Sequence, residues 1–388
     1  MKFKRIFLLI LDSLGVGEAI DANNYGDEGA NTLLHIKENY DLFVPNLQKL
    51  GFLNTLNMDE NDNVDAYYTI ARPTNPGKDT LTGHYELMGV HNLVPFKSFA
   101  ENGFPRELIE YIETTTRRRV IGNRNAEGNE IINELGERHM EFGALILYVS
   151  NGSNLCIAAH EDVIPVAKLY EYAEKIREIT MTEEFKVGRV IARAFTGTPG
   201  KFKFTAERRD FAVKPPSKSV LNILSENDYS VISIGKVADV FDDEGITKKI
   251  KAKDNQEAIN KLTDIMGKNF SGLCIANLND FDSMYGHKRD IEGYAKAIEE
   301  FDVEIPMIIN KLDMEDLLII TADHGCDPSF KGTFHTRENV PVIIYGRNLK
   351  EPKRLDILDS MADIGATITD NFELSRPLIG RSFLEKLK

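Results

Sequence analysis

The chain has 388 residues, of which 42% are hydrophobic and 28% are charged, and its formal net charge is −14. These proportions describe a globular protein with a sizeable core, and the length suits two domains or one large domain with an insertion. The acidic balance argues against a nucleic-acid partner, and no apolar run approaches the roughly 18–20 residues that span a bilayer.

The first element that we expect is a buried strand. The N-terminal segment MKFKRIFLLILD combines basic residues with an apolar run, as a short signal peptide does. However, the run ends in Asp12 and lacks a small-residue cleavage site, so a strand over 5–12 is the better interpretation. Three widely spaced cysteines indicate neither a disulfide framework nor a zinc site, and we expect a cytoplasmic protein.

Further apolar runs alternate with amphipathic stretches along the chain. Short runs rich in β-branched residues, each bounded by polar residues or glycine, occur at 229–235, 272–280, 316–325 and 340–346. Such runs are typical of strands buried on both faces of a parallel sheet. Helical patterns at 293–312 and 362–372 supply crossover connections, so the predicted fold class is α/β.

The middle of the chain has a different character. Residues 97–213 contain basic runs, a strand-like segment at 143–150 and a helix-like segment at 165–180. The segment VPF at 94–96 and the Pro215-Pro216 pair resemble domain boundaries. We therefore predict an α+β domain over 97–213, inserted into a core formed by 1–96 and 214–388.

The polar segment GKDTLTGHYE at 77–86 raises the question of a phosphate-binding loop or a nucleophile. A Walker A loop requires a glycine at position 72 and a hydroxyl residue directly after Lys78, and the chain has neither. What remains is a turn that carries a possible hydroxyl nucleophile, Thr80 or Thr82.

Aspartate and histidine residues follow several predicted strands or precede the next one. They are Asp12, Asp280, Asp282, His287, Asp323, His324 and His335. Sites in open parallel sheets form outside the carboxyl ends of the strands, so these side chains are expected at one edge. An aspartate after a strand can be only a helix N-cap, and Asp280 is left out of the ligand set. The remaining mixture of carboxylates and imidazoles predicts two divalent ions, an arrangement suited to phosphoryl transfer.

Long segments of the chain resemble the motifs of the phosphopentomutase family, within the alkaline phosphatase superfamily. These segments are DSLGVGEAIDA (12–22), GKDTLTGHYELMG (77–89), NDFDSMYGHKRD (279–290), TADHGCDP (321–328) and HTRENVP (335–341). GRVIAR (188–193) and IGKVAD (234–239) extend the resemblance to nearly the whole chain. It implies an alkaline-phosphatase-like core, with a mostly parallel sheet flanked by helices, and an inserted cap domain.

The resemblance also implies roles for individual residues. Thr80 would be the nucleophile that carries the phosphoryl group. One ion would be held by Asp282, His287 and His335, and the other by Asp12, Asp323 and His324, with Thr80 between them. The substrate-binding residues would be Ser150, Arg189, Ile191 and Lys236. The implied cofactors are two Mn²⁺ ions and a sugar bisphosphate primer, and the implied substrate is (deoxy)ribose 1-phosphate or 5-phosphate.

Three positions depart from the family pattern on the substrate side. Gly152 stands where the family has an aspartate that contacts the sugar, and Phe204 stands where it has a second phosphate-binding arginine. Phe334 replaces an aspartate beside His335. Loss of an arginine removes a bidentate phosphate clamp, which a lysine cannot reproduce geometrically.

Three hypotheses follow for the function. The first is a phosphopentomutase that acts on a small-molecule sugar phosphate, with no nucleic-acid or membrane partner. The second is a metal-dependent phosphomutase or phosphohydrolase acting on a different sugar phosphate, as the altered positions would allow. The third, a catalytically inactive binding protein, is disfavoured because the nucleophile and all the implied ligands are present.

Overall fold

The computed structural model describes residues 3–57, 63–92, 94–150 and 153–387. The chain divides into two compact units, of which the first comprises Met1–Leu93 and Pro215–Lys388. The second unit comprises Val94–Lys214, so it interrupts the first in sequence. Gly152 lies outside the described residues.

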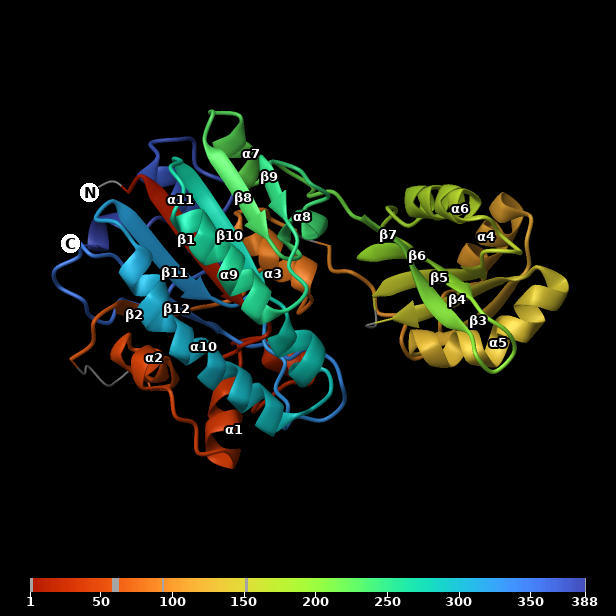
Figure 1. The fold of residues 1–388 in the computed structure, drawn as a ribbon, viewed down its shortest axis with the longest axis horizontal. Coiled ribbons are helices and arrows are strands. Elements are labelled where there is room, and N and C mark those ends of the chain that lie inside the picture. Colours follow the sequence, from red (N-terminus) through yellow and green to blue (C-terminus); the bar gives the residue numbers. More distant parts are fainter. Residues whose placement is uncertain (1–2, 58–62, 93, 151–152, 388) are drawn as a thin grey trace. The chain divides into compact units, whose positions relative to one another are not determined.

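A seven-stranded sheet forms the centre of the first unit, within the residues described (Figure 1). In sheet order its strands are β2 (Tyr67–Ala71), β12 (Val340–Tyr345), β11 (Asp316–Thr321), β1 (Arg5–Leu11), β10 (Gly272–Leu278), β8 (Ser230–Ile234) and β9 (Lys248–Ile250). The five strands from β11 to β9 are parallel, whereas β12 runs antiparallel to both β11 and β2. The predicted α/β class and the mostly parallel sheet are confirmed.

The apolar runs in the sequence form strands because both faces of this sheet are covered. All seven residues of β1 are buried, and β10 and β11 are buried along their whole lengths. The flanking helices are α1 (Thr32–Asn39), α2 (Pro45–Lys49), α3 (Thr80–Leu87), α7 (Val220–Ser225), α8 (Val237–Val240), α9 (Asn255–Met266), α10 (Ile291–Lys311) and α11 (Ala362–Asn371). α10 packs with α1, α2 and α9, and α11 packs with α3 and α7.

The second unit is built on a separate five-stranded sheet among the described residues. Its strands, in sheet order, are β3 (Val120–Asn125), β4 (Leu145–Ser150), β5 (Asn154–His160), β6 (Arg189–Thr196) and β7 (Lys203–Ala212). Its helices are α4 (Arg106–Thr116), α5 (Gly128–Phe142) and α6 (Val166–Ile179). Parallel and antiparallel pairs alternate across the sheet, so it is of mixed type.

Alternate residues of β4 show how both faces of this second sheet are covered. Leu145 and Leu147 belong to an apolar cluster that includes residues of α4 and α6. Ile146 and Tyr148 belong to a second cluster that includes Ile131 and other residues of α5. The unit therefore has its own core, as an independently packed domain requires. In the part of the chain that the structure describes, no helix is both long and apolar enough to cross a bilayer.

Candidate metal centre

Acidic and imidazole side chains gather at one edge of the sheet in the first unit. β1, β10 and β11 are neighbouring parallel strands, so their carboxyl ends meet at the same edge. Asp12 directly follows β1, and Asp323 comes shortly after β11. Asp282 lies in a short helical segment, Phe281–Gly286, that begins after β10. Chain segments far apart in the sequence therefore deliver their side chains to one place.

Asp12, Asp323 and His324 form the first of two groups at this edge. All three are buried, and their potential ligand atoms lie within 4.8 Å of one another. His324 Nε2 is 3.6 Å from Asp12 Oδ1 and 3.3 Å from Asp323 Oδ2. Two carboxylates and one imidazole at these separations have the size and the chemistry for one divalent ion.

Asp282, His287 and His335 form the second group, also with ligand atoms within 4.8 Å of one another. The Nε2 atoms of His287 and His335 are 3.4 Å and 3.3 Å from the two Asp282 oxygens, and 3.0 Å from each other. The His324 and His335 rings are stacked with centroids 3.8 Å apart, so the two groups are adjacent. The structure thus brings together the six acidic and imidazole side chains among the seven residues that the sequence predicts as metal ligands, the seventh being Thr80.

Hydrogen bonds to the main chain fix which nitrogen of each histidine is free. Nδ1 of His287 is 2.8 Å from the Thr333 carbonyl, and Nδ1 of His335 is 2.9 Å from the Lys78 carbonyl. His324 Nδ1 is 3.1 Å from the Gly325 carbonyl. A carbonyl can only accept, so Nδ1 is the donor in each ring, and Nε2 carries the lone pair when the ring is neutral. In their neutral forms the three rings therefore direct lone pairs toward the carboxylates.

Unpaired carboxylate oxygens indicate what the two groups could hold. Asp12 Oδ1, Asp282 Oδ1 and Asp323 Oδ2 are buried and have no hydrogen bond of good geometry from the described residues, although His84 Nδ1 lies 3.0 Å from Asp323 Oδ2. Buried polar atoms without a partner are rare, because removing them from water without compensation is costly. Cations placed between these oxygens and the imidazole lone pairs would provide that compensation. The residues therefore fit a pair of divalent metal ions.

Thr80 lies beside the first group, at the start of α3. Asp79 caps this helix by accepting a hydrogen bond from the Thr82 amide, which leaves the half-buried Thr80 as its first residue. Thr80 Oγ1 is 3.2 Å from His324 Nε2 and accepts a 3.4 Å hydrogen bond from Lys236 Nζ. The Thr82 hydroxyl donates instead to Asp79, so it is engaged by its own helix cap. The sequence suggests the hydroxyl of Thr80 or of Thr82 as a nucleophile. The Thr80 hydroxyl is the one that lies beside the predicted metal ligands.

Negatively charged carboxylates are concentrated and buried at this edge of the sheet. Burial, followed by the neighbouring Asp323 carboxylate, raises the pKa of Asp12 to about 7. Burial lowers the pKa of the His335 imidazole, which favours its neutral form. Burial also opposes the charge on Lys236, but the carboxylates led by Asp12 outweigh it and raise the pKa of the lysine. Lys236 forms an ion pair with Asp12, whose Oδ2 also accepts from Asn277 Nδ2 at 2.8 Å.

A comparison with models of known protein families identifies the family of this chain. Residues 4–376 match the model of the metalloenzyme superfamily. The chain belongs to the metalloenzyme superfamily. Divalent metal ions are therefore expected in these two groups of ligands.

Solved structures similar to this member of the metalloenzyme superfamily include three that span most of the chain. A phosphoglycerate mutase from Leishmania mexicana, at low cobalt concentration, has 12% identity and a TM-score of 0.50, covering 98% of this chain and 97% of its own. The PH0037 protein from Pyrococcus horikoshii has 16% identity and a TM-score of 0.49, with coverages of 96% and 98%. A Vibrio parahaemolyticus protein in the alkaline phosphatase superfamily has 12% identity and a TM-score of 0.45, with coverages of 99% and 70%. At these identities the likeness concerns the fold alone.

Arg337, which the sequence did not single out, holds the loop that leads to Thr80. Its guanidinium donates to the carbonyls of Pro73, Asn75 and Gly77 at 3.1, 2.9 and 2.5 Å. It also forms a bidentate pair with Asp21, at 2.9 and 3.1 Å. The side chain is only 3% exposed. One buried cation therefore fixes three points of this loop.

Asp27 provides a second attachment for the same loop. Its Oδ2 accepts from Lys78 Nζ at 2.6 Å and from the Arg337 amide at 2.8 Å. The Lys78 carbonyl in turn accepts from His335 Nδ1. The position of this loop therefore determines both where α3, which begins at Thr80, is located and how the His335 imidazole is oriented. Asp27, Asp21 and Arg337 are distant in sequence, and the sequence offers no pattern that links them.

α3 packs directly on the backbone of the metal centre. A Cβ atom on Gly83 would lie 1.9 Å from the Asp323 carbonyl oxygen, so only glycine permits this approach. His84, which is fully buried, directs Nδ1 to the Thr80 carbonyl at 3.0 Å and also lies 3.0 Å from Asp323 Oδ2. These two residues of the GKDTLTGHYE segment therefore connect the threonine to the aspartate.

The residues expected to bind substrate are divided between the two units. Lys236 lies in the first unit, next to Thr80, and lines a cavity of about 310 Å³ together with Lys251 and Lys253. Ser150, Arg189 and Ile191 lie in the second unit, on β4 and β6.

Within the second unit, Arg189 is partly neutralised. Its Nη1 is 3.5 Å from Asp210 Oδ2, and the same carboxylate accepts from Arg208 at 2.7 and 2.9 Å. Burial raises the pKa of Asp210, but the bonds from Arg208 outweigh it, so the pKa is lowered and the group is ionised. Ile191 is 5% exposed and belongs to the apolar cluster beneath α5.

The structure accounts for one of the departures from the family pattern. The guanidinium of Arg193 stacks on the Phe204 ring, 3.5 Å from its centroid, which is a close cation–π contact. A phenylalanine at this position therefore orders a neighbouring arginine. Phe334 is 44% exposed, and its carbonyl accepts a hydrogen bond from Arg289 at 2.8 Å.

Proposed function

We propose that the protein is a phosphomutase that interconverts pentose 1-phosphate and pentose 5-phosphate through a phosphothreonine at Thr80. The observation that carries this proposal is the convergence at one sheet edge. Three imidazole Nε2 atoms and three buried carboxylate oxygens meet beside a hydroxyl at a helix N-terminus. Binding of two cations and transfer of a phosphoryl group account for all of these features together.

The two groups of ligands would each hold one divalent ion. Asp12, Asp323 and His324 would hold the ion nearer to Thr80, whose hydroxyl already contacts His324. Asp282, His287 and His335 would hold the second. Such ions lower the pKa of a bound hydroxyl and neutralise the charge of a transferring phosphoryl group. The mixture of carboxylate and imidazole ligands suits Mn²⁺, Zn²⁺, Fe²⁺ or Mg²⁺, and we propose Mn²⁺ because of the resemblance to the phosphopentomutase family.

The side chains around Thr80 would stabilise its charged forms. The Lys236 ammonium, 3.4 Å from Oγ1, would favour the alkoxide that attacks phosphorus. Because Thr80 begins α3, the helix dipole would favour a phosphate on its oxygen. Lys251 and Lys253, which line the cavity beside Lys236, would bind the rest of an anionic substrate.

The mutase cycle conserves the phosphoryl groups. Phosphothreonine 80 transfers its phosphoryl group to the free hydroxyl of a sugar monophosphate, which gives a sugar bisphosphate. The bisphosphate reorients, its other phosphoryl group passes to Thr80, and the isomeric monophosphate leaves. A sugar bisphosphate would prime the dephosphorylated enzyme by the same transfer.

The second unit, Val94–Lys214, would act as a cap that binds the sugar phosphate and excludes water. Arg189 and Ser150 would be its polar contacts to substrate, whereas the side chain of Ile191, which was also predicted to bind substrate, is buried beneath α5. Arg208, which shares Asp210 with Arg189, is placed to contribute the second cationic group that Phe204 cannot.

Phe204 supports a second candidate function, a phosphomutase or phosphohydrolase for another sugar phosphate. The stack of Arg193 on Phe204 gives this face of β6 and β7 an aromatic surface where the family has an arginine. Arg193 keeps its positive charge in this stack, so the surface differs from that of the family in shape and in the donors it offers, as a different sugar phosphate would require.

Phosphorus NMR of the products separates these functions. The Mn²⁺-loaded enzyme is incubated with ribose 1-phosphate and a catalytic amount of a hexose bisphosphate. Ribose 5-phosphate as the product supports the mutase, and free phosphate supports a hydrolase. If ribose phosphates remain unchanged while another sugar phosphate is isomerised, the second candidate function is correct.

A further inference from the structure

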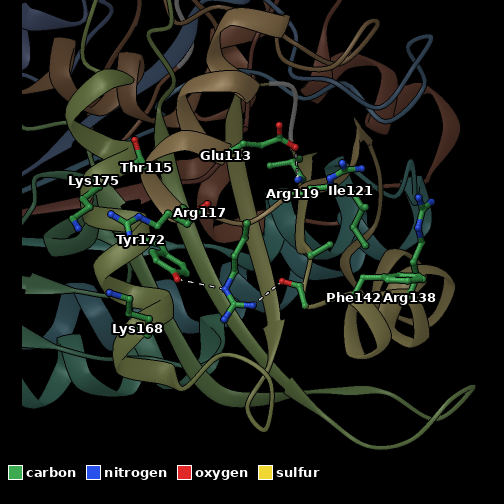
Figure 2. Close-up of a pocket in the computed structure, with 15 residues that line it drawn as sticks. Glu113, Thr115, Arg117, Arg119, Ile121, Arg138, Phe142, Lys168, Tyr172 and Lys175 are labelled. Carbon is green, nitrogen blue, oxygen red and sulfur yellow. Dashed lines mark hydrogen bonds between the residues drawn. The ribbon is translucent and has the colours of Figure 1, made fainter.

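A groove rich in arginine and lysine runs across the second unit (Figure 2). Its volume is about 1300 Å³, which exceeds that of many small-ligand pockets. Its cationic side chains are Arg117, Arg118, Arg119, Arg138, Lys168 and Lys175, and the one acidic residue among those lining it is Glu113. The whole chain carries a net charge of −14, so this gathering of positive charge is local and contrary to the overall balance.

Part of this charge has a structural role. Arg118 donates from Nη1 to the Gly143 carbonyl at 2.7 Å, at the end of α5, and from Nε to the Tyr172 hydroxyl at 3.4 Å. Cations at helix C-termini are favourable because they complement the helix dipole. Lys168 and Lys175 both pair with Glu171, at 2.8 and 2.9 Å.

Three arginines in the groove have no such role. The side chains of Arg117, Arg119 and Arg138 are exposed, and none forms a hydrogen bond or ion pair with any residue that the structure describes. In Figure 2, Arg117 lies toward the side of Lys168 and Lys175, whereas Arg119 and Arg138 lie toward the other side. Unpaired guanidinium groups on both sides of one concavity are available to an anion. Their planar forks match the oxygens of phosphate groups.

The backbone at Arg117 points to the same conclusion. Arg117 ends α4 in the left-handed conformation, with φ 54°, a position where glycine is usual because it has no Cβ. α5 ends at this same groove with φ 64°, and there the residue is Gly143. The chain thus uses glycine at one of the two helix ends and accepts strain to place an arginine at the other.

We propose that this groove binds an oligophosphate anion, a molecule with two or more linked phosphate groups. A single phosphate would engage one or two arginines, whereas the three unpaired guanidinium groups on both sides of the groove match a longer anion. Phe142, 67% exposed and also lining the groove, offers a ring on which a nucleobase could stack if the anion is a nucleotide. This site does not depend on the proposed mutase activity.

Calorimetric titration of the metal-loaded full chain with tripolyphosphate and with ATP tests the proposal. The comparison is with a triple variant carrying Arg117→Gly, Arg119→Gln and Arg138→Gln. Any binding at the metal centre is common to both proteins, so the difference between them reports the groove. Arg117→Gly relieves the strained backbone, and the other two positions are exposed, so the variant should fold. Arg106→Gln, an exposed position on the same helix α4, is the matched control.

We expect the triple variant to lose about a hundredfold or more in tripolyphosphate affinity, because three charge-assisted contacts are removed, and the control to retain it. Equal affinities for ATP and tripolyphosphate identify a free oligophosphate as the ligand. Tighter binding of ATP that Phe142→Ala abolishes identifies a nucleotide. Equal affinities of the wild type and the triple variant would overturn the proposal. So would binding of an RNA oligonucleotide without binding of either small anion.

Discussion

Replacement of Arg337 by lysine should displace the loop that leads to Thr80 relative to the predicted metal ligands. Arginine makes five hydrogen bonds here, three to loop carbonyls and two to Asp21. Lysine keeps the charge but has one ammonium group with three donors, so it cannot serve both the loop and the carboxylate. At least two of the five bonds are lost, and the fork geometry is lost with them.

The expected size of the effect follows from these contacts. A hydrogen bond from a charged group contributes about 1.5–3 kcal/mol, so the loss of two would reach about 3–6 kcal/mol. The Asp21 side chain is 38% exposed, and water will therefore satisfy part of what is lost. We expect the free energy of unfolding to fall by about 2–3 kcal/mol. A displacement of about 1 Å at Thr80 would lower kcat roughly a hundredfold.

Urea unfolding and steady-state turnover at saturating metal measure the two effects. None of the six metal ligands is replaced, but His335 is oriented by the Lys78 carbonyl of this loop, so any loss of metal should be confined to the group of Asp282, His287 and His335.

Arg347→Lys is the matched control. Arg347 also donates to two main-chain carbonyls, those of Ile309 and Asn310 in the last turn of α10, but its side chain is exposed. If Arg337→Lys has wild-type stability and wild-type kcat, Arg337 does not position the loop. If both ions are lost, the substitution has disturbed the whole metal centre and has not acted through the loop alone.

Three further changes test other parts of the structure. Asp323→Asn should lower the metal content from two ions per chain to one, because it removes a carboxylate from the first group of ligands; retention of both ions by elemental analysis would contradict this ligand set. Gly83→Ala should lower the melting temperature and the activity together, since the new Cβ meets the Asp323 carbonyl, whereas Gly267→Ala, where the nearest atom is 3.5 Å away, should change neither. Burial lowers the pKa of the His139 imidazole below its ordinary value of 6.5. The neutral ring accepts a hydrogen bond at Nε2 from the His160 amide. This neutral form stabilises the fold above pH 6.5, and the stabilisation is lost as the pH falls through the folded-state pKa. Calorimetry of the second unit's transition should therefore show a loss of stability toward acid pH that His139→Gln removes, and an unchanged slope in the variant would exclude His139 as the source.

The core strands could be predicted because burial on both faces leaves a continuous apolar run. β1, β8, β10, β11 and β12 all lie within the runs expected from the sequence. Six strands of the described residues were not predicted: β2, β3, β5, β6, β7 and β9. β3, β7 and β9 are partly or largely exposed, and their apolar residues form no continuous run. β2, β5 and β6 are mostly buried, but their apolar runs are short or interrupted by polar residues and were not singled out. Such strands are defined by their pairing partners and not by their own composition.

Part of the candidate site could also be predicted from the sequence. The side chains at the carboxyl ends of the strands were identifiable because their residue types suit metal ions and because parallel strands end at one edge. Arg337, Asp27 and His84 were not identified, since each acts through contacts with the main chain or with residues distant in sequence. The three-dimensional fold alone creates those contacts.

Mapping of a covalent phosphoryl group tests whether Thr80 is the nucleophile. The Mn²⁺-loaded protein is treated with a sugar bisphosphate, quenched in acid, and analysed by intact mass and by sequencing of its phosphorylated peptide. We predict one phosphoryl group per chain, located on Thr80 and absent from Thr80→Ala, which should retain its fold and its metal ions. A phosphoryl group on Thr82 or Ser13, or a protein that turns over substrate without acquiring any phosphoryl group, would contradict this prediction.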